Sequence, residues 1–199
     1  LKTINDATTG AIVLATPTAA LSGTVSDIVD AFAGTVTTNT GTITISDANT
    51  TDIQATDIAT INTAITGAIT VSNAIDINGS GSDVAAAFTA IDTNTGNATA
   101  NVTGTDYTVA HLKTINDATT GAIVLADPSV DLSGDATDIA AAFAGTVTTH
   151  TGTVTITDSS YTVAELQTIN NATSGNVIIS NVNGGNPGLA LNNASATNT

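Results

Sequence analysis

The 199-residue chain contains no cysteine, methionine or tryptophan, and only 3% of its residues are aromatic. Without cysteine it can form no disulfide, a lack that is compatible with export because long extracellular bacterial proteins often share it. Without large aromatic side chains, the core has to consist of thin layers of Ile, Val, Leu and Ala. The hydrophobic fraction of 41% is large enough to build such a core.

Positive charge is almost missing. Lys2 and Lys113 are the only basic side chains besides histidine, against 17 Asp and Glu, and the formal net charge is −15. Nucleic acids and anionic lipids require cationic surfaces, so both are excluded as expected partners. No apolar run is long enough to cross a bilayer, so we expect no membrane insertion. The scarcity of basic residues also argues against a polysaccharide lyase.

The chain repeats itself. Leu1–Ala15 and Leu112–Ala126 are the same fifteen residues, 111 positions apart, and the same offset relates Ala31–Thr38 to Ala142–Thr149. Two matches at one offset indicate tandem duplication, which is typical of repeat arrays. Because the chain begins inside a repeat and without Met, we expect the natural protein to continue upstream, where a signal peptide would lie.

Two shorter patterns alternate along the chain. T-I-N-x-A-x-[TS]-G recurs at intervals of 57, 54 and 54 residues, and D-[IV]-x-x-A-F lies between its copies. We call the segments that carry the first pattern A-type coils and those that carry the second B-type coils, each of roughly 27 residues. The patterns begin at Thr3, Thr60, Thr114 and Thr168 (A-type) and at Asp27, Asp83 and Asp138 (B-type). We expect one array over residues 1–180, with residues 181–199 as a C-terminal cap or tail.

Each coil carries a helix signal. Thr162 and Glu165 have the spacing of a capping box, in which a hydroxyl and a carboxylate each accept a free backbone amide at a helix start. Apolar residues follow at helical spacing over two to three turns, too short for a helix that is stable alone. The same spacing recurs at Thr24/Asp27, Ser80/Asp83 and Asp135/Asp138, with departures at Gln54/Asp57 and Thr108/His111.

A glycine and then a strand signal follow each helix signal. The second and fourth residues after the glycine are apolar, which places them on one face of a strand. Gly96 is the exception, because Ala98 and Ala100 follow it, and a thin or irregular strand is expected there. A second short strand is expected in Ser129–Gly134. The apolar pairs are Ile12/Leu14, Ile43/Ile45, Ile69/Val71, Ile123/Leu125, Val154/Ile156 and Val177/Ile179.

These signals predict a right-handed α/β solenoid, in which each coil contributes a short helix and parallel strands. The alternative is an all-β solenoid, in which the capping boxes open tight turns instead of helices.

No catalytic residue, cofactor site or enzyme activity is predicted. His111 aligns with Glu165, and His150 aligns with Asn39, so both histidines are expected on the solvated surface. Phosphate-binding loops, dinucleotide fingerprints and zinc-protease motifs do not occur in the sequence.

Four carboxylates at one A-to-B junction are candidate calcium ligands, because hard oxygen donors suit Ca²⁺. Three of the four corresponding positions in the first A–B pair carry no carboxylate, which favours a role in capping helices and ending turns. A metal site is therefore left open. The four residues are Asp127, Asp131, Asp135 and Asp138.

Polar residues also recur in rows. The asparagine of the A-type pattern, at Asn5, Asn62, Asn116 and Asn170, is expected to stack into an amide ladder, with a ligand-reading row as the alternative. Thr42/Thr44 and Thr153/Thr155 resemble the arrays of ice-binding solenoids, but alanine and valine at the matching A-type positions should interrupt them. Sequons for N-glycosylation occur at Asn49, Asn97, Asn101, Asn171 and Asn193.

The units YTVAELQTINNATSG (161–175) and TDIAAAFAGTVTTHTGTVTITD (137–158) resemble repeats in giant exported proteins of cyanobacteria and other Gram-negative bacteria. The resemblance implies a secreted or surface-attached structural or adhesive array.

We therefore expect an extracellular structural protein whose copies stack head to tail into a filament or surface matrix. The alternative is an adhesin stalk or a binding solenoid for glycan, calcium or ice.

Overall fold

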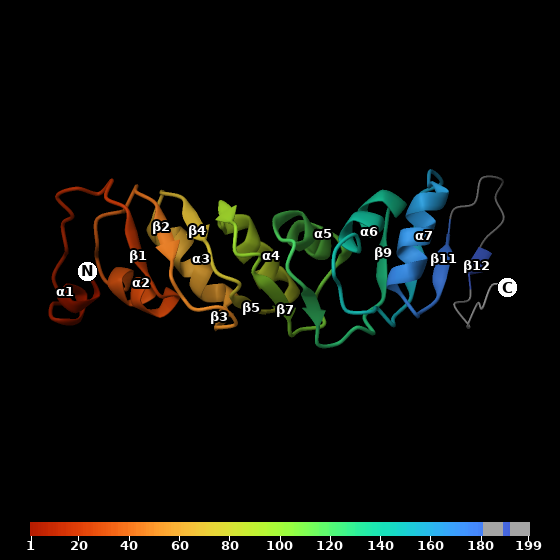
Figure 1. The fold of residues 1–199 in the computed structure, drawn as a ribbon, viewed down its shortest axis with the longest axis horizontal. Helices are drawn as coiled ribbons and strands as arrows, with labels where there is room; N and C mark the ends of the chain where they lie inside the picture. Colours follow the sequence, from red (N-terminus) through yellow and green to blue (C-terminus); the bar gives the residue numbers. More distant parts are fainter. Residues whose placement is uncertain (181–188, 192–199) are drawn as a thin grey trace.

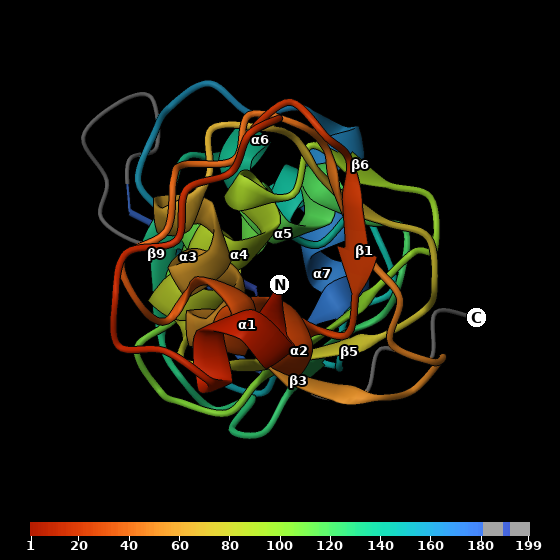
Figure 2. The same cartoon turned by 90° about the vertical axis from the view of Figure 1, so that its left-hand side faces the viewer.

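A computed structural model describes residues 1–180 and 189–191. The molecule is elongated, and its helices follow one another in chain order along the long axis (Figure 1). Seen end-on, the elements of successive coils lie over one another around a shared centre (Figure 2).

Each coil contains one helix over the described residues, so the predicted alternation of helix-bearing coils is confirmed. The all-β alternative is wrong. The A-type helices are α1 (Lys2–Asp6), α3 (Ala55–Ala64), α5 (Val109–Ala118) and α7 (Val163–Ala172). The B-type helices are α2 (Val25–Phe32), α4 (Gly81–Ala90) and α6 (Ala136–Ala142).

The predicted caps explain where most of these helices begin. At α7 the capping box is complete, because Thr162 accepts from the Glu165 amide and Glu165 accepts from the Thr162 amide. Thr24 and Ser80 make the equivalent hydroxyl cap at α2 and α4, and Thr108, which departs from the sequence pattern, makes the same cap at α5. The prediction is wrong at Asp135, whose side chain makes no capping hydrogen bond at α6.

The strands form three sheets, and every strand pair is parallel except the last. The described part of the chain is therefore an α/β protein with parallel strands, as predicted. The first sheet is β1 (Leu21–Gly23), β2 (Ile43–Ile45), β4 (Ile69–Val71) and β6 (Thr93–Asn94). The second is β3 (Asp52–Gln54), β5 (Asp76–Gly79), β7 (Thr99–Val102) and β8 (Ile123–Leu125). The third is β9 (Leu132–Gly134), β10 (Val154–Ile156), β11 (Val177–Ile179) and β12 (Leu189–Leu191).

The core consists of like residues stacked in register. Ile43 pairs with Ile69, and Val154 with Val177, and all four side chains are fully buried. The predicted inward positions are confirmed in β2, β4, β8, β10 and β11. The first coil differs, since Ile12 and Leu14 are only partly buried there.

The segment after Gly96 forms strand β7, so an irregular strand is wrong there, whereas a thin one agrees with the small buried alanines. Ala98, Ala100 and Val102 are fully buried, and β7 pairs with β5 and β8. Its small side chains leave room for Phe88 of α4, which is almost fully buried in the same core. The second short strand expected in Ser129–Gly134 is β9, as predicted.

The recurring glycine allows neighbouring coils to approach closely. A Cβ atom added at Gly67 would lie 1.9 Å from the Gly41 carbonyl oxygen, and one at Gly175 would lie 1.9 Å from that of Gly152. These distances are far shorter than any van der Waals contact. Glycine is therefore required by close backbone stacking at these positions.

The C-terminal end departs from the parallel order, because β12 pairs with β11 in antiparallel register. The rest of the predicted cap or tail, residues 181–199, lies outside the described residues.

Candidate functional site

The first coil exposes some side chains more than its internal copy does. Ile4 is 57% exposed, whereas the identical residue Ile115 is fully buried, and Val13 is 81% exposed against 43% for Val124. The sequences are the same, so this difference arises from the surroundings. The internal copy packs against α4 and β7, which precede it in the chain. The described residues contain no equivalent of α4 and β7 ahead of the first coil.

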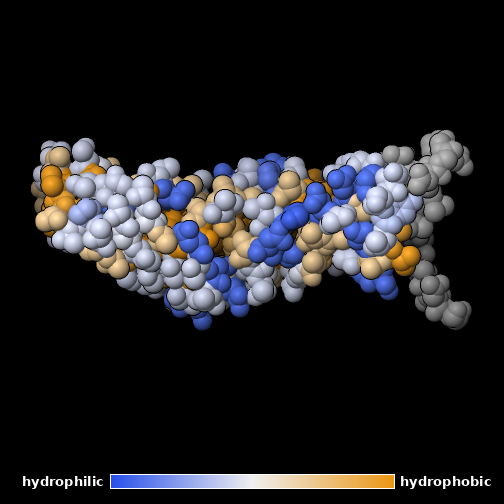
Figure 3. All heavy atoms as spheres, turned by 90° about the horizontal axis from the view of Figure 1, so that it is seen from above, coloured by the Kyte–Doolittle hydropathy of each residue, from blue (hydrophilic) through white to orange (hydrophobic). Residues whose placement is uncertain are grey.

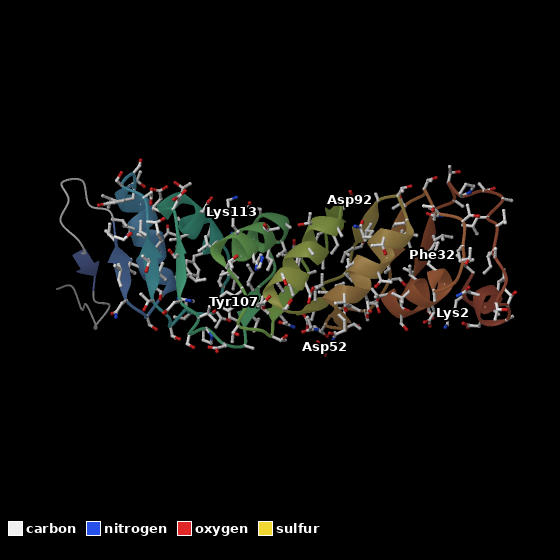
Figure 4. The ribbon with its side chains drawn as sticks, turned by 180° about the vertical axis from the view of Figure 1, so that it is seen from behind. Lys2, Phe32, Asp52, Asp92, Tyr107 and Lys113 are labelled. Atoms are coloured by element: carbon white, nitrogen blue, oxygen red, sulfur yellow. The ribbon has the colours of Figure 1, made fainter. Side chains whose placement is uncertain are left out.

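This end of the molecule is apolar and hollowed. An open hollow of about 360 Å³ lies between the first two coils and is lined by Leu1, Leu21, Ile28 and Phe32 among others. Lys2 and Phe32 lie at this end in Figure 4, and hydrophobic atoms are concentrated there in Figure 3. We call the side of Leu1–Ala15 that faces away from the second coil the first-coil face.

The first coil is held to the second by polar contacts as well. The Lys2 ammonium lies 2.5 Å from the Asp30 carboxylate, which raises the pKa of Lys2 through that hydrogen bond. The Asn5 amide donates to the Asp30 carbonyl oxygen at 2.6 Å. These contacts fix the first coil against α2, so the first-coil face is a formed surface.

The asparagine row does not form the expected amide ladder at Asn5 and Asn116. The Asn116 amide donates to the Ala141 carbonyl oxygen in α6 at 2.8 Å, which matches the contact from Asn5 to α2. Like asparagines cannot stack directly, because a B-type coil lies between two A-type coils. At these two positions the asparagine instead links an A-type helix to the next B-type helix.

Three aspartates that the sequence analysis did not identify link coils in the other direction. Each lies in the coil that follows a B-type helix. Its carboxylate accepts a hydrogen bond from the first backbone amide of that helix. The pairs are Asp47 with Val25 at 2.7 Å, Asp106 with Gly81 at 2.9 Å, and Asp158 with Ala136 at 2.9 Å. The bond from Gly81 lowers the pKa of Asp106. Each aspartate follows a Ser or Thr, two residues after the end of β2 or β10 and four residues after the end of β7, and this recurrence was the available signal.

The four candidate calcium ligands do not come together as a site. Among the described residues, no group of three His, Asp or Glu side chains is placed to hold a metal ion. Asp127 accepts from the amide and hydroxyl of Ser129, which lowers its pKa, and Asp131 accepts from the Thr153 amide. Asp127 thus stabilises a turn, the role that the sequence favoured, whereas Asp131 links its coil to the next one.

The predicted solvated position is wrong for His150, whereas His111 is partly exposed. His150 is fully buried, and its Nε2 lies 2.7 Å from the Val130 carbonyl oxygen, which only a protonated Nε2 can bond. Burial lowers the pKa of His150. His111 is half-buried at the start of α5, and its Nδ1 is shielded from solvent.

The outer face of the first sheet carries a continuous row of hydroxyls. Ser22, Thr44, Thr70 and Thr93 occupy one register position on four adjacent strands. The positions where an interruption was expected, Ala11/Val13 and Ala122/Val124, lie outside this sheet, and Thr70 of an A-type coil continues the row. In the third sheet the row ends, because Ile178 follows Ser133 and Thr155.

The outer face of the second sheet is acidic and amide-rich. Asp52 pairs in register with Asp76 and Gln54 with Asn78, and the Asn78 amide donates to Asp52 at 3.1 Å. Asp52 lies at the edge of the molecule in Figure 4. At β3 and β5 the second sheet thus presents carboxylates and amides, whereas the first sheet presents hydroxyls.

Comparison with known proteins found no matching family model, curated protein or solved structure. Over the part of the chain that is described, no helix has the length and apolar character needed to cross a bilayer.

Proposed function

We propose that the chain is a right-handed α/β solenoid that serves as an extracellular structural protein, a subunit of a filament or surface matrix joined end to end. The observation that carries this proposal is the in-register, parallel pairing of strands from one coil to the next along the chain. The first-coil face has the same sequence as Leu112–Ala126, in which Leu112, Ile115, Ile123 and Leu125 are buried. A neighbouring coil would therefore be stabilised on this face by contacts that the protein already uses.

The solenoid is supported by the pairing of the strands. Each strand of β1–β11 pairs in parallel and in register with a strand of an adjacent coil. Every coil therefore offers strand edges with which the next coil can pair. Burying one Ile, Leu or Val contributes about 1.5–3 kcal/mol, and the first-coil face carries several of these residues.

End-to-end contact joins unlike surfaces, so it does not close and gives an open filament. Head-to-tail stacking of copies is one form of this assembly. The extracellular placement is supported by the surface of uncharged hydroxyls and amides, by the absence of cysteine, and by the resemblance of the repeats to those of giant exported proteins.

Immunogold electron microscopy of the producing cells tests this function. Antibodies against the chain are expected to label filaments or a matrix outside the cell, with labels recurring along the filament axis. Labelling confined to the cell interior, or dispersed outside filaments, would contradict the proposal.

A binding solenoid is the second candidate, and the uninterrupted hydroxyl row on the first sheet favours it. Parallel strands hold successive hydroxyls about 4.8 Å apart, a regular spacing suited to an ordered ligand surface. Adsorption to ice and to polysaccharide would be measured for the native chain and for Thr44→Lys/Thr70→Lys. Specific retention that this double variant abolishes would support binding, whereas Thr99→Lys on the second sheet serves as the control.

A further inference from the structure

The second B-type coil departs from the other two just after the phenylalanine of its D-[IV]-x-x-A-F pattern. The four residues that follow are A-G-T-V in the first and third B-type coils, at Ala33–Val36 and Ala144–Val147. In the second they are T-A-I-D, at Thr89–Asp92. Because the other two coils agree with each other, the alanine in place of glycine and the aspartate in place of valine are specific to the second coil.

The glycine of the other two coils makes room for an asparagine. A Cβ atom added at Gly34 would lie 2.7 Å from the Asn5 Oδ1 atom, and one added at Gly145 would lie 2.1 Å from the Asn116 Oδ1 atom. The bond from each asparagine to the next B-type helix therefore requires that no side chain is present at the glycine.

The second coil does not meet this requirement, because Ala90 occupies the matching position. Helix α4 continues through it, and the Ile91 amide donates to the Ala87 carbonyl oxygen at 3.2 Å. Asn62, the matching asparagine of α3, would meet the Ala90 methyl group in the position that Asn5 takes. Its side chain is exposed and makes no hydrogen bond within the described part of the chain.

Asn62 instead lines an open hollow of about 400 Å³ between α3 and α4. Its polar lining comes from both coils, with Asn62 and Thr66 from the A-type coil and Thr89 and Asp92 from the B-type coil. Asp92 lies at the upper edge of the molecule in Figure 4. Two of these four side chains are thus polar groups that the other B-type coils lack.

The hollow offers both donors and acceptors to a ligand. Asp92 Oδ2 accepts from the Ile69 amide at 2.8 Å, which positions the carboxylate and leaves its second oxygen to accept another hydrogen bond. The Thr89 hydroxyl donates to the Ala85 carbonyl oxygen at 2.8 Å, so its lone pairs face further donors. The Asn62 amide adds two donors and an acceptor.

A neutral sugar ring has the complementary chemistry. Each of its hydroxyls can donate to a carboxylate, in a charge-assisted bond, while it accepts from an amide. Ala86 and Ala90 line the same hollow and offer methyl groups to the C–H bonds of the ring. Neither Lys2 nor Lys113 lines it, so Asp92 and the net charge of −15 would repel an anionic ligand.

We propose that the hollow between α3 and α4 binds a neutral hexopyranose residue, whose hydroxyls are held by Asp92 and Asn62. The site lies within one molecule. It goes beyond the proposed structural function and depends neither on end-to-end assembly nor on the hydroxyl row of the first sheet.

A heteronuclear NMR titration of the native chain with the methyl glycosides of glucose, galactose and mannose tests the proposal. At least one glycoside is expected to cause saturable shifts at the amides of residues 62–67 and 86–92 and at the Asn62 side-chain amide. Asn62→Ala and Asp92→Asn should each weaken binding about tenfold. Asp92→Asn keeps an oxygen for the Ile69 amide, and Asn62 is exposed, so both variants should fold. Thr63→Ala, on α3 but outside the lining, is the control and should bind as the native chain does.

The absence of saturable shifts around the hollow with all three glycosides would overturn the proposal, as would unchanged affinity in both variants. Shifts confined to Ser22 and Thr44 would assign sugar binding to the hydroxyl row instead, and would overturn it too. Glucuronate is a further arm, and it should bind much more weakly than the methyl glucoside. Equal binding of the two would contradict the neutral ligand. None of these results depends on filaments, whose absence outside the cell would contradict the proposed function alone.

Discussion

Asn39 and His150, 111 residues apart, occupy equivalent buried positions and make the same contact. The Asn39 Nδ2 donates to the Ala19 carbonyl oxygen at 3.0 Å, and the His150 Nε2 lies 2.7 Å from the matching carbonyl oxygen of Val130. Asparagine and neutral histidine interchange here because each presents an N–H group to the preceding coil.

The substitution His150→Asn is expected to remove a pH dependence of stability. Burial lowers the pKa of His150 in the folded chain, so the unfolded chain binds the proton more readily. Stability is therefore complete above the unfolded pKa of about 6.5 and declines as pH falls through the folded pKa, by at most about 1.4 kcal/mol per pH unit. Asp131, the nearby carboxylate, opposes this shift only in part.

Urea unfolding at several pH values between 7.5 and 5 measures this effect. The variant should lose less stability on acidification than the native chain, since Asn39 already shows that asparagine fits the position. Equal losses in both proteins would mean that His150 does not carry the dependence.

Asp158→Ala is expected to lower stability by about 1 kcal/mol, because it removes the cap from the first amide of α6. The matched control is Asp135→Ala, at the N-cap position of the same helix, where the side chain makes no capping bond. Chemical denaturation of both variants compares them directly. A larger loss at Asp135 than at Asp158 would contradict the assignment of the cap to the following coil.

Gly67→Ala is expected to lower stability by roughly 3 kcal/mol, because the added methyl group would overlap the Gly41 carbonyl oxygen and push two coils apart. Gly10→Ala, in the recurring glycine of the first coil, meets no backbone and should change stability by less than about 1 kcal/mol. Thermal unfolding of the two variants checks this contrast. Similar losses at both glycines would refute close backbone stacking as their reason.

Ile115→Ala is expected to lower the free energy of unfolding by about 2–5 kcal/mol, as for a fully buried residue. Ile4→Ala, in the same local sequence, should cost less than about 1 kcal/mol in the isolated chain, since Ile4 is exposed. Equilibrium denaturation measures both. Equal costs would show that the first coil is already covered.

The sequence predicts elements within one coil better than contacts between coils. The capping box of Thr162 and Glu165 and the inward pair Ile43 and Ile45 follow from local spacing, and both are confirmed. The contact of Asp158 with Ala136 spans 22 residues, and periodicity cannot show which neighbour a recurring residue faces. The burial of His150 was missed for the same reason. The sequence repeat alone does not predict the exposure of the first-coil face. That exposure is recognised only by comparison with the internal copy, where the same residues are buried.

Electron diffraction and microscopy of the native extracellular material test the end-to-end account most directly. The account predicts fibres one molecule wide, with an axial spacing of about 4.8 Å that arises from parallel strands stacked along the fibre. Isolated rods, each the length of one molecule and never joined at their ends, would contradict it.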